Sequence, residues 1–509
     1  MKKIWKHLFN QNMLYILLML VQIAFLVLSV LFLNRNYAWV YGALLLLNGL
    51  LIVYITNSRK NPTYKNAWLV VIAVLPIFGG LSYLFLKTRR DTRIFFHNYK
   101  QQMEQTKPLL TQEPDAARHL FNDSQQVYNL STYLQHTGFP VYEQTNVTYF
   151  PLGEEQFAEM KNRLREAKRF IFIEYFIIAP GKMWNEFLEI LIERARAGVE
   201  VRLMYDGFGT KFFSTGDFLK IAKQHHIQCR CFNPFRPLLS SAQNNRDHRK
   251  ILVIDGQVGF TGGVNLADEY INHIEKYGRW KDSALMLEGE GVRSMTALFL
   301  QMWSILCQPE FEQFLSDPIP AAANAKGFVV PYGDCPLDGE RVGEMVYMDM
   351  LNRARKYVHI ISPYLILDGE LETALRFAAE RGVDVHLILP GKPDKWFVYA
   401  LAKTHYKALI SSGVKISEWQ PGFTHAKIVI ADGVEAVAGT INLDYRSLYH
   451  HFENAVWMRG TDCIANMEAD FQDTLTRCRR VEQTRESIWQ GKKLLHLAGI
   501  LLKFIAPLV

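Results

Sequence analysis

A short charged pattern occurs twice in this 509-residue chain. Each copy reads His-x-Lys, then four residues and an Asp. A Gly follows fourteen residues after each His, and an Asn follows seventeen residues after it. The first copy comprises His248, Lys250, Asp255, Gly262 and Asn265, and the second comprises His425, Lys427, Asp432, Gly439 and Asn442. Two copies of one cationic constellation predict a single site built from two similar halves.

The residue types in this pattern suit the handling of a phosphate ester. Lysine and asparagine side chains can donate hydrogen bonds to non-bridging phosphate oxygens. One imidazole can attack phosphorus while the other protonates the leaving oxygen. No zinc-binding spacing or carboxylate cluster accompanies the pattern in the sequence. We therefore expect no metal and no cofactor in the chemical step, because the lysines can supply the electrostatic stabilisation.

The neighbours of each motif indicate the elements that position it. Residues 251–254 and 428–431 are apolar and rich in β-branched side chains, so each motif is expected on a buried strand, with its His and Lys on one face. Asp255 and Asp432 belong to the candidate catalytic motif, but each precedes a Gly in a typical hairpin-turn pair. That position predicts a structural role at the strand end. The Gly and Asn would return on the next strand beside the His and Lys.

Similarity between the two halves extends upstream of the motif. Residues 167–173 resemble residues 354–360, and each segment reads as a helix end that runs into an apolar strand. This alternation predicts an α/β fold. We expect two lobes, at residues 131–320 and 321–485, related by a pseudo-two-fold axis with the active site at their interface.

These features together resemble the phospholipase D superfamily, whose hallmark is the duplicated motif. The run Gly439–Ser447 resembles the Gly-Thr-x-Asn-x-Asp-x-Arg-Ser run of the bacterial cardiolipin synthases. Residues 173–175, 280–282 and 362–364 also match that family's pattern. The resemblance covers most of the chain from about residue 130 to the C-terminus.

The resemblance also implies a carboxylate beside a catalytic histidine. Glu453 lies 28 residues after His425, where the superfamily places an acid that orients the histidine, so we expect Glu453 to hold His425. The first half departs from this spacing, because its nearest matching acid, Asp282, lies 34 residues after His248. By the superfamily's usual order, His248 is expected to be the nucleophile and His425 the general acid and then base.

An activity follows from the resemblance as well. In such enzymes one histidine is thought to attack a phosphatidyl phosphodiester and expel an alcohol, after which a second alcohol takes the phosphatidyl group. The cardiolipin synthases join two phosphatidylglycerol molecules and release glycerol. Another acceptor, such as phosphatidylethanolamine, a free alcohol or water, would make the protein a different transphosphatidylase or a phospholipase.

Two other classes of function were weighed against this one. A nuclease of the same superfamily would suit the basic composition, but the apolar N-terminus argues against it, and no nucleic-acid partner is expected. A non-catalytic membrane scaffold is disfavoured because both motif histidines and both motif lysines are present. The formal charge of +7 and the pI near 8.9 favour anionic partners, which we expect to be phosphatidylglycerol and anionic membrane lipid.

Three apolar runs within residues 1–94 predict a membrane region. The runs at about 13–33 and 39–55 are expected to be transmembrane helices, whereas the run at about 67–86 is broken by Pro76 and is either re-entrant or a third span. A re-entrant third run leaves every basic cluster on the cytoplasmic side. We therefore expect a multi-pass protein of the bacterial cell membrane with its catalytic domain on the cytoplasmic side.

The remaining segments are less informative. Residues 95–130 read as a linker with helical pieces. Residues 486–509 read as an amphipathic segment, which either packs on the catalytic core or lies on anionic lipid. Six scattered cysteines do not form a disulfide framework, which suits a reducing compartment.

Overall fold

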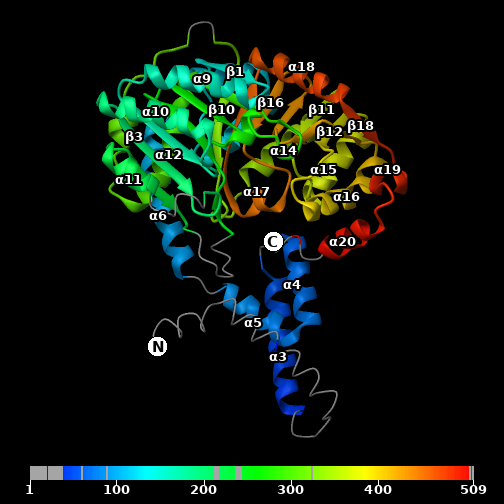
Figure 1. The fold of residues 1–509 in the computed structure, drawn as a ribbon. Helices are drawn as coiled ribbons and strands as arrows, with labels where there is room; N and C mark the ends of the chain where they lie inside the picture. The colour runs from blue at the N-terminus through cyan, green and yellow to red at the C-terminus, as the bar shows by residue number, and fades with distance from the viewer. Residues whose placement is uncertain are drawn as a thin grey trace. The chain divides into compact units, whose positions relative to one another are not determined.

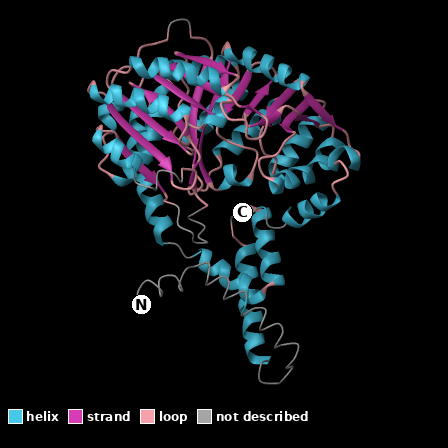
Figure 2. Ribbon diagram, viewed as in Figure 1, coloured by secondary structure: helices cyan, strands magenta, loops and turns pink. Residues whose placement is uncertain are grey.

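The computed structural model describes residues 20, 38–58, 61–87, 90–210, 217–234, 244–322, 325–503 and 506. The chain divides into two compact units. One comprises residues up to Ile94 with the short segments 235–244 and 500–509, and the other comprises Phe95–Pro234 and Asn245–Gly499. The first is helical where it is described, and the second contains all the strands (Figures 1 and 2).

The N-terminal unit contains the helices α3 (Ala38–Thr56), α4 (Pro62–Val74) and α5 (Pro76–Lys87). The predicted run 13–33 lies outside the described residues, apart from Leu20. The run 39–55 corresponds to α3, and the run 67–86 comprises parts of two helices with a break before Pro76. In the described part of the chain, no helix has both the length and the apolar character that crossing a membrane would need.

A small core joins these three helices. It consists of the side chains of Leu51, Ile55, Trp68, Ile72 and Tyr83. The two adjacent glycines of α5 allow close packing, because a Cβ at Gly79 would lie 2.6 Å from the backbone oxygen of Val71. A Cβ at Gly80 would likewise lie 2.6 Å from the side-chain oxygen of Asn48.

Residues 95–130, which the sequence predicted to be a linker, are largely helical. The helices are α6 (Arg90–Thr106), α7 (Pro114–Asp123) and α8 (Gln125–His136). Leu120 and Leu134 are fully buried and belong to the main hydrophobic core of the catalytic unit. Apart from the start of α6, this segment is therefore part of that unit.

Each lobe of the catalytic unit is built on one mixed sheet. The strands of the first sheet are β1 (Thr145–Phe150), β2 (Phe170–Tyr175), β3 (Glu200–Asp206), β4 (Gln228–Phe232), β6 (Lys250–Ile254), β7 (Val258–Gly262) and β9 (Ala284–Gly289). Those of the second are β10 (Phe328–Asp334), β11 (Tyr357–Ile361), β12 (Asp384–Pro390), β13 (Lys415–Trp419), β15 (Ile428–Ala431), β16 (Glu435–Gly439), β17 (His451–Arg459) and β18 (Cys478–Val481).

The two sheets repeat one topology. The first has the order β1-β9-β7-β6-β2-β3-β4, and the second has the order β10-β17-β16-β15-β11-β12-β13 with β18 added at the edge. In each sheet the last three strands of the shared order are parallel, and the remaining pairs of that order are antiparallel. The predicted α/β fold with two similar lobes is confirmed.

Helices flank both sheets, so central strands such as β2 and β15 are buried along their whole length and are mainly apolar in sequence. The helices are α9 (Gly153–Glu166), α10 (Lys182–Arg196), α11 (Asp217–Gln224), α12 (Val292–Trp303), α13 (Phe311–Leu315), α14 (Val342–Arg353), α15 (Gly369–Glu380), α16 (Trp396–Ser411), α17 (Tyr445–Tyr449) and α18 (Cys463–Thr476). Short 3-10 turns occupy Lys107–Leu109, Asp268–Ile271 and Ser304–Leu306.

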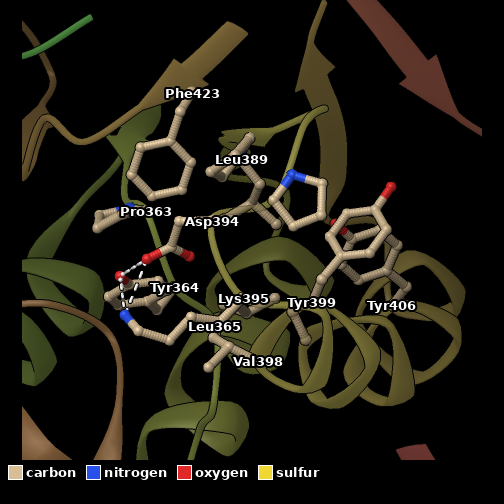
Figure 3. A pocket seen from close by; sticks show the side chains of 13 residues that line it. Pro363, Tyr364, Leu365, Leu389, Asp394, Lys395, Val398, Tyr399, Tyr406 and Phe423 are labelled. Carbon is tan, nitrogen blue, oxygen red and sulfur yellow. Dashed lines mark hydrogen bonds and ion pairs between the residues drawn. The ribbon is translucent and has the colours of Figure 1, made fainter. Parts of the chain in front are cut away.

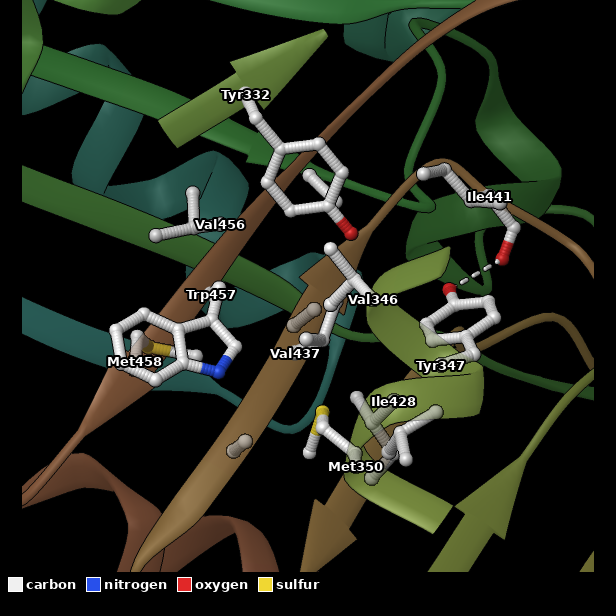
Figure 4. Close-up of a cluster of buried hydrophobic side chains, with 14 of the residues drawn as sticks. Tyr332, Val346, Tyr347, Met350, Ile428, Val437, Ile441, Val456, Trp457 and Met458 are labelled. Atoms are coloured by element: carbon white, nitrogen blue, oxygen red, sulfur yellow. Dashed lines mark hydrogen bonds between the residues drawn. The ribbon is translucent and has the colours of Figure 1, made fainter. Parts of the chain in front are cut away.

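The core of the second lobe fixes one half of the motif. Trp457 and Met458 of β17, Val437 of β16 and Val346 of α14 belong to one cluster of buried hydrophobic side chains (Figure 4). From α14, the hydroxyl of Tyr347 donates a hydrogen bond of 3.1 Å to the backbone oxygen of Ile441. That residue directly precedes Asn442 of the motif.

Two short parallel strand pairs join the lobes. β5 (Arg246–Asp247) of the first lobe pairs with β17 of the second. In return, β14 (Gly422–Thr424) of the second lobe pairs with β8 (Arg279–Lys281) of the first. Each of these strands lies directly beside a candidate site residue, so the connections between lobes also shape the site.

The C-terminal segment contains α19 (Arg485–Trp489) and α20 (Lys493–Lys503). Gly499 is buried, and a Cβ there would lie 2.7 Å from the backbone oxygen of Ala400 in α16. Leu494 and Leu497 of the same helix are exposed. One side of α20 thus packs on the catalytic unit while another presents leucines outward.

Candidate active site

The two motif lysines lie at the starts of strands β6 and β15. Lys250 is the first residue of β6, Lys427 comes one residue before β15, and both histidines lie in the extended segments just upstream. Each lysine Nζ donates a hydrogen bond to the backbone oxygen of the histidine two residues earlier, at 2.7 Å for Lys250 and 2.5 Å for Lys427. All four side chains are buried. The expected strand is therefore present, but both histidines precede it.

The two motif aspartates are structural. The carboxylate of Asp255 accepts hydrogen bonds from the backbone N–H groups of residues 168–170, and that of Asp432 accepts them from residues 355–357, all at 2.7–2.9 Å. Both Asp have φ of +55°, and the Gly after each has φ of +71°, which is the predicted Asp-Gly turn. Their place in the catalytic set is thus corrected, since these carboxylates tie each hairpin to the start of its neighbouring strand.

The motif glycines let adjacent strands approach closely. Gly262 is paired with Ala284, and Gly439 with Ala455. A Cβ on either glycine would lie 2.5–2.6 Å from the Cα of its paired alanine, a distance that real Cβ atoms do not tolerate. Asp282 and Glu453 each lie two residues before the paired alanine. This shared register makes Asp282 the counterpart of Glu453 despite their different spacing from the histidines.

Each carboxylate holds the histidine of the opposite half. Nδ1 of His248 lies 2.9 Å from the carboxylate oxygens of Glu453, and Nδ1 of His425 lies 2.8 Å from Oδ2 of Asp282. The expected pairing of Glu453 with His425 is therefore wrong. Both acids are fully buried, so each forms its hydrogen bond out of contact with solvent.

The strand pairs between the lobes explain why each carboxylate meets the histidine of the opposite half. Asp247 of β5 is paired with Phe452 of β17, so the next residues in the two chains, His248 and Glu453, come together. The backbone N–H of His248 donates to the Phe452 oxygen at 2.9 Å.

The second half repeats this arrangement. Thr424 of β14 is paired with Lys281 of β8, and the next residues are His425 and Asp282. The backbone N–H of His425 donates to the Lys281 oxygen at 2.6 Å. Strand pairing between lobes thus determines which acid meets which histidine.

The pKa values of the two carboxylates and the two histidines are all lowered in the site. Burial alone would raise the pKa of Glu453 and of Asp282, but the charge and hydrogen bond of the paired histidine outweigh it and lower both pKa values. Burial lowers the pKa of His248 well below its ordinary value. Burial and then repulsion from Lys427 lower that of His425 to about 4.

At neutral pH each imidazole is consequently neutral and donates its Nδ1 proton to an ionised carboxylate. Nε2 then carries the lone pair. Across the residues that the structure describes, no hydrogen bond engages Nε2 of His248 or of His425. Both rings therefore have a nitrogen available to a reacting phosphorus or oxygen atom.

The protonation of the two motif lysines depends on whether an anion is bound beside them. Burial lowers the pKa of Lys250 to about 8 and that of Lys427 to about 7, although Glu453 and Asp282 respectively oppose the shift. A bound phosphodiester would reverse much of this shift, because its negative charge favours the ammonium forms. The two lysines therefore reach their full positive charge when an anion binds beside them.

The two motif asparagines differ in their surroundings. Oδ1 of Asn265 accepts a hydrogen bond from the backbone N–H of Ile177 at 3.0 Å, and Nδ2 donates to the hydroxyl of Tyr270 at 2.7 Å. One of the two Nδ2 protons of the expected phosphate donor of the first half is therefore already engaged. Oδ1 of Asn442 is buried and, in the described part of the chain, has no hydrogen-bond partner.

Several residues of the site were not singled out in the sequence. Tyr270, Trp280 and Phe423 surround His425 with ring centroids at 5.4–6.0 Å. Phe176 and His451 approach His248, with ring centroids at 5.1 and 5.3 Å. These rings exclude water and account for the lowered histidine pKa values. One signal could have identified His451, because it lies two residues before Glu453 on a strand and therefore shares its face.

A small pocket opens beside Phe423, the residue two before His425 (Figure 3). It has a volume of about 20 Å³ and is lined mainly by apolar and aromatic side chains, among them Tyr364, Val398 and Tyr399. The hydroxyl of Tyr364 donates to Asp394 at 2.7 Å.

Comparison with family models gives two matches. The model described as "Cardiolipin synthase, PLD-like domain" matches residues 160–303 and 347–475. A second model, described as "Phospholipase_D-nuclease N-terminal", matches residues 46–87. The first pair of segments contains both motif copies, Asp282 and Glu453.

Among similar proteins, an uncharacterised protein of Streptococcus mutans is 49% identical over 460 residues, covering 90% of this chain and 99% of its own. A cardiolipin synthase of Halalkalibacterium halodurans is 32% identical, covering 90% of this chain and 93% of its own. Cardiolipin synthase 2 of Bacillus cereus is 33% identical, and the match covers 83% of this chain and 82% of that protein.

Among solved structures, the phosphatidylserine synthase of Haemophilus influenzae is similar in fold. The match covers 75% of this chain and 98% of the chain of that synthase, with a TM-score of 0.57 and 14% sequence identity. At that identity the likeness concerns the two-lobed architecture alone.

Proposed function

Because the chain belongs to the cardiolipin synthase family of the phospholipase D superfamily, we propose that it transfers a phosphatidyl group between two phosphatidylglycerol molecules, giving cardiolipin and glycerol. One observation carries the proposal. Two buried histidines are each held at Nδ1 by an ionised carboxylate, and the charge of Lys250 in the first half lowers the pKa of His425 in the second. This arrangement supplies a nucleophile, an acid and charge for a phosphodiester.

In the first step, Nε2 of His248 attacks the phosphorus of one phosphatidylglycerol. An N–P bond forms as the P–O bond to the glycerol headgroup breaks. Protonated His425 gives its proton to the leaving oxygen, so glycerol departs as a neutral alcohol. Glu453 stabilises the positive charge that develops on the ring of His248, as the acid of a Ser-His-Asp triad does.

In the second step, neutral His425 removes the proton from a hydroxyl of the second phosphatidylglycerol. The resulting oxygen nucleophile attacks phosphorus, and the P–N bond to His248 breaks. Cardiolipin is released, and both histidines return to their starting state. Asp282 holds His425 in the tautomer that each transfer needs.

The first step needs a proton on His425, whose pKa in the empty site is about 4. A phosphodiester monoanion beside Nε2 raises that pKa, because it stabilises the imidazolium form. Lys250 and Lys427 meanwhile neutralise charge on the non-bridging oxygens. Anion binding and protonation of the acid are thus coupled in this proposal.

We further propose that the N-terminal unit attaches the enzyme to the bacterial cell membrane, with the catalytic unit on the cytoplasmic side. In support, Trp39, Leu46 and Leu50 of α3 are 86%, 67% and 62% exposed, and a contiguous apolar surface of this kind calls for a lipid or protein cover. Washing membranes of an expressing host with alkaline carbonate tests the attachment. Release of the full-length protein into the wash would contradict it.

The activity is tested with purified protein and phosphatidylglycerol in neutral detergent. We expect cardiolipin and glycerol in equal amounts by mass spectrometry, and no product with His248→Ala. The matched control is His119→Ala, which replaces an exposed histidine far from the motif in sequence. It should retain the wild-type rate.

The same assay distinguishes the alternatives. Phosphatidic acid as the main product would identify a phospholipase. A mixed diester formed only when phosphatidylethanolamine or another alcohol is added would identify a transphosphatidylase with a different acceptor. Cleavage of DNA at a rate above that of phosphatidylglycerol would contradict the proposal altogether.

A further inference from the structure

A third histidine lies within the site and has no part in the two steps above. His451 is the first residue of β17, and its side chain is buried, with 8% exposed. Its ring centroid lies 5.3 Å from that of His248. The side chain therefore faces the nucleophile proposed above and the acid that orients it.

The polar atoms of His451 lack hydrogen bonds. Within the described residues, neither ring nitrogen has a hydrogen-bond partner, although both are buried. Nδ1 lies 3.5 Å from Oε1 of Glu453, an ion-pair distance, while that carboxylate accepts its hydrogen bond from His248 at 2.9 Å. A buried nitrogen without a hydrogen-bond partner is costly, and a ligand on Nδ1 would complete one of the two.

The donor set identifies the class of ligand. His248, His451 and Glu453 each offer one ligand atom within 4.8 Å of the other two. Two imidazoles and a carboxylate, with a remaining open position, are the ligands that many proteins use for Zn²⁺. Mg²⁺ and Ca²⁺ prefer all-oxygen sites and fit this set poorly.

The two distances from Glu453 to the histidines agree with that ion. Bond lengths of about 2.0–2.2 Å at a tetrahedral centre place neighbouring ligand atoms about 3.3 Å apart. Oε1 of Glu453 lies 2.9 Å from Nδ1 of His248 and 3.5 Å from Nδ1 of His451. When the ion binds, the distance from Glu453 to His248 would increase by a few tenths of an ångström, and the distance from Glu453 to His451 would decrease by a similar amount. We propose that His248, His451 and Glu453 form a Zn²⁺ site whose occupation inhibits the enzyme.

Inhibition follows from the tautomer of His248, and it rests on the proposed function. A metal ion on Nδ1 displaces the proton that Glu453 normally holds there. The neutral ring must then carry its proton on Nε2, so no lone pair remains to attack phosphorus. The ammonium groups of Lys250 and Lys427 oppose a further cation, which makes this a reversible inhibitory site.

The test titrates Zn²⁺ into purified full-length enzyme with phosphatidylglycerol in neutral detergent, using an affinity tag without histidines. Each variant is compared with its own metal-free rate. We expect His451→Asn to raise the inhibitory Zn²⁺ concentration at least tenfold. The neighbouring variant His450→Asn should leave that concentration unchanged. Equal inhibition of wild type and His451→Asn, or none of either, would overturn the proposal.

A second readout does not depend on activity. Co²⁺ in a site of nitrogen and oxygen ligands absorbs visible light, so we expect a saturable band with the wild type that is absent with His451→Asn. Circular dichroism establishes that each variant is folded, and His451→Gln replaces the Asn variant if that one is not. A band without any lipid activity would refute the proposed function alone. The same band in wild type and in the folded His451 variant would refute the metal site alone.

Discussion

Glu453 accepts a hydrogen bond from Nδ1 of His248, although the two residues are 205 positions apart and belong to different lobes. Asp282 and His425 repeat the relationship in the other direction across 143 positions. Neither lobe therefore orients its own histidine. The effects of mutating an acid should appear in the step that uses the histidine of the other lobe.

Glu453→Gln should slow the formation of the phosphatidyl-histidine. The variant keeps the shape of the side chain but removes the charge that stabilises the ring of His248, so we expect a decrease of roughly 10²-fold in the first step. Rapid-quench measurement with labelled phosphatidylglycerol would follow the covalent intermediate. Label found on His425 in the wild type would reverse the assigned roles.

The matched control for that variant is Glu468→Gln. Glu468 holds His359 at 2.9 Å in a similar histidine–carboxylate pair of the second lobe, but outside the candidate site. Its replacement should leave the rate of the first step unchanged. A comparable decrease in both variants would mean that Glu453 affects the rate only through general stability.

Asp282→Asn should slow both steps, because His425 gives a proton in the first step and removes one in the second. His425 must remove a proton from the acceptor, and without the carboxylate its imidazolium form is less stable. We expect the phosphatidyl-histidine to persist longer than in Glu453→Gln, with overall turnover again lowered by roughly 10²-fold. If chemical quenching finds less intermediate in Asp282→Asn than in Glu453→Gln, the crossed assignment is incorrect.

Anion binding should take up protons at pH 7.5. The pKa of Lys427 is about 7 in the empty site, so much of this lysine is neutral there, and a bound anion raises its pKa and restores the charge. Affinity for sulfate should therefore fall as the pH rises above 7. Calorimetry in two buffers of different ionisation enthalpy measures the uptake, which Lys427→Met should reduce. Proton release on binding would contradict this account.

Chelation should not lower activity. Two lysines, and not a divalent ion, neutralise the phosphate in the proposed mechanism, so excess chelator in neutral detergent should leave the rate unchanged or raise it by removing adventitious zinc. The check is the initial rate with and without chelator. A loss of activity that one specific divalent ion restores would show that the chemical step needs that ion.

Gly439→Ala should destabilise the catalytic unit. A Cβ there would lie 2.5 Å from the Cα of Ala455, so β16 and β17 must separate, at a cost of about 1–3 kcal/mol. Thermal unfolding measures the change. Gly369→Ala is the control, because its Cβ meets nothing within 4 Å at the start of α15, and its stability should be unchanged. An equal effect of both variants would disprove the packing argument.

The sequence predicted the parts of the site that depend on local pattern. The apolar run after each Lys identified β6 and β15, and the Asp-Gly pairs identified turns with positive φ at Asp255 and Asp432. These features depend on neighbouring residues. A strand's apolar character and a turn's preference for Asp and Gly do not depend on the rest of the chain.

The parts that depend on contact between lobes could not be predicted. The resemblance to the superfamily assigned Glu453 to His425, on the basis of their spacing within the second lobe. The actual partner is set by the pairing of β5 with β17, and β5 is only two residues long. A strand of two residues is too short to show an alternation of apolar and polar side chains in the sequence. The helical pieces at residues 95–130 were predicted, but their packing on the catalytic core was not, because it depends on contacts with residues distant in the sequence.

The two strand pairs between the lobes also bear on how the enzyme loses activity. β5 with β17 and β14 with β8 hold both histidine–carboxylate pairs, so a small rotation of one lobe against the other would break both hydrogen bonds together. A half-functional state, with one histidine oriented and the other not, is not available to such a motion. Heat inactivation should therefore abolish both half-reactions in parallel, before the core of either lobe melts.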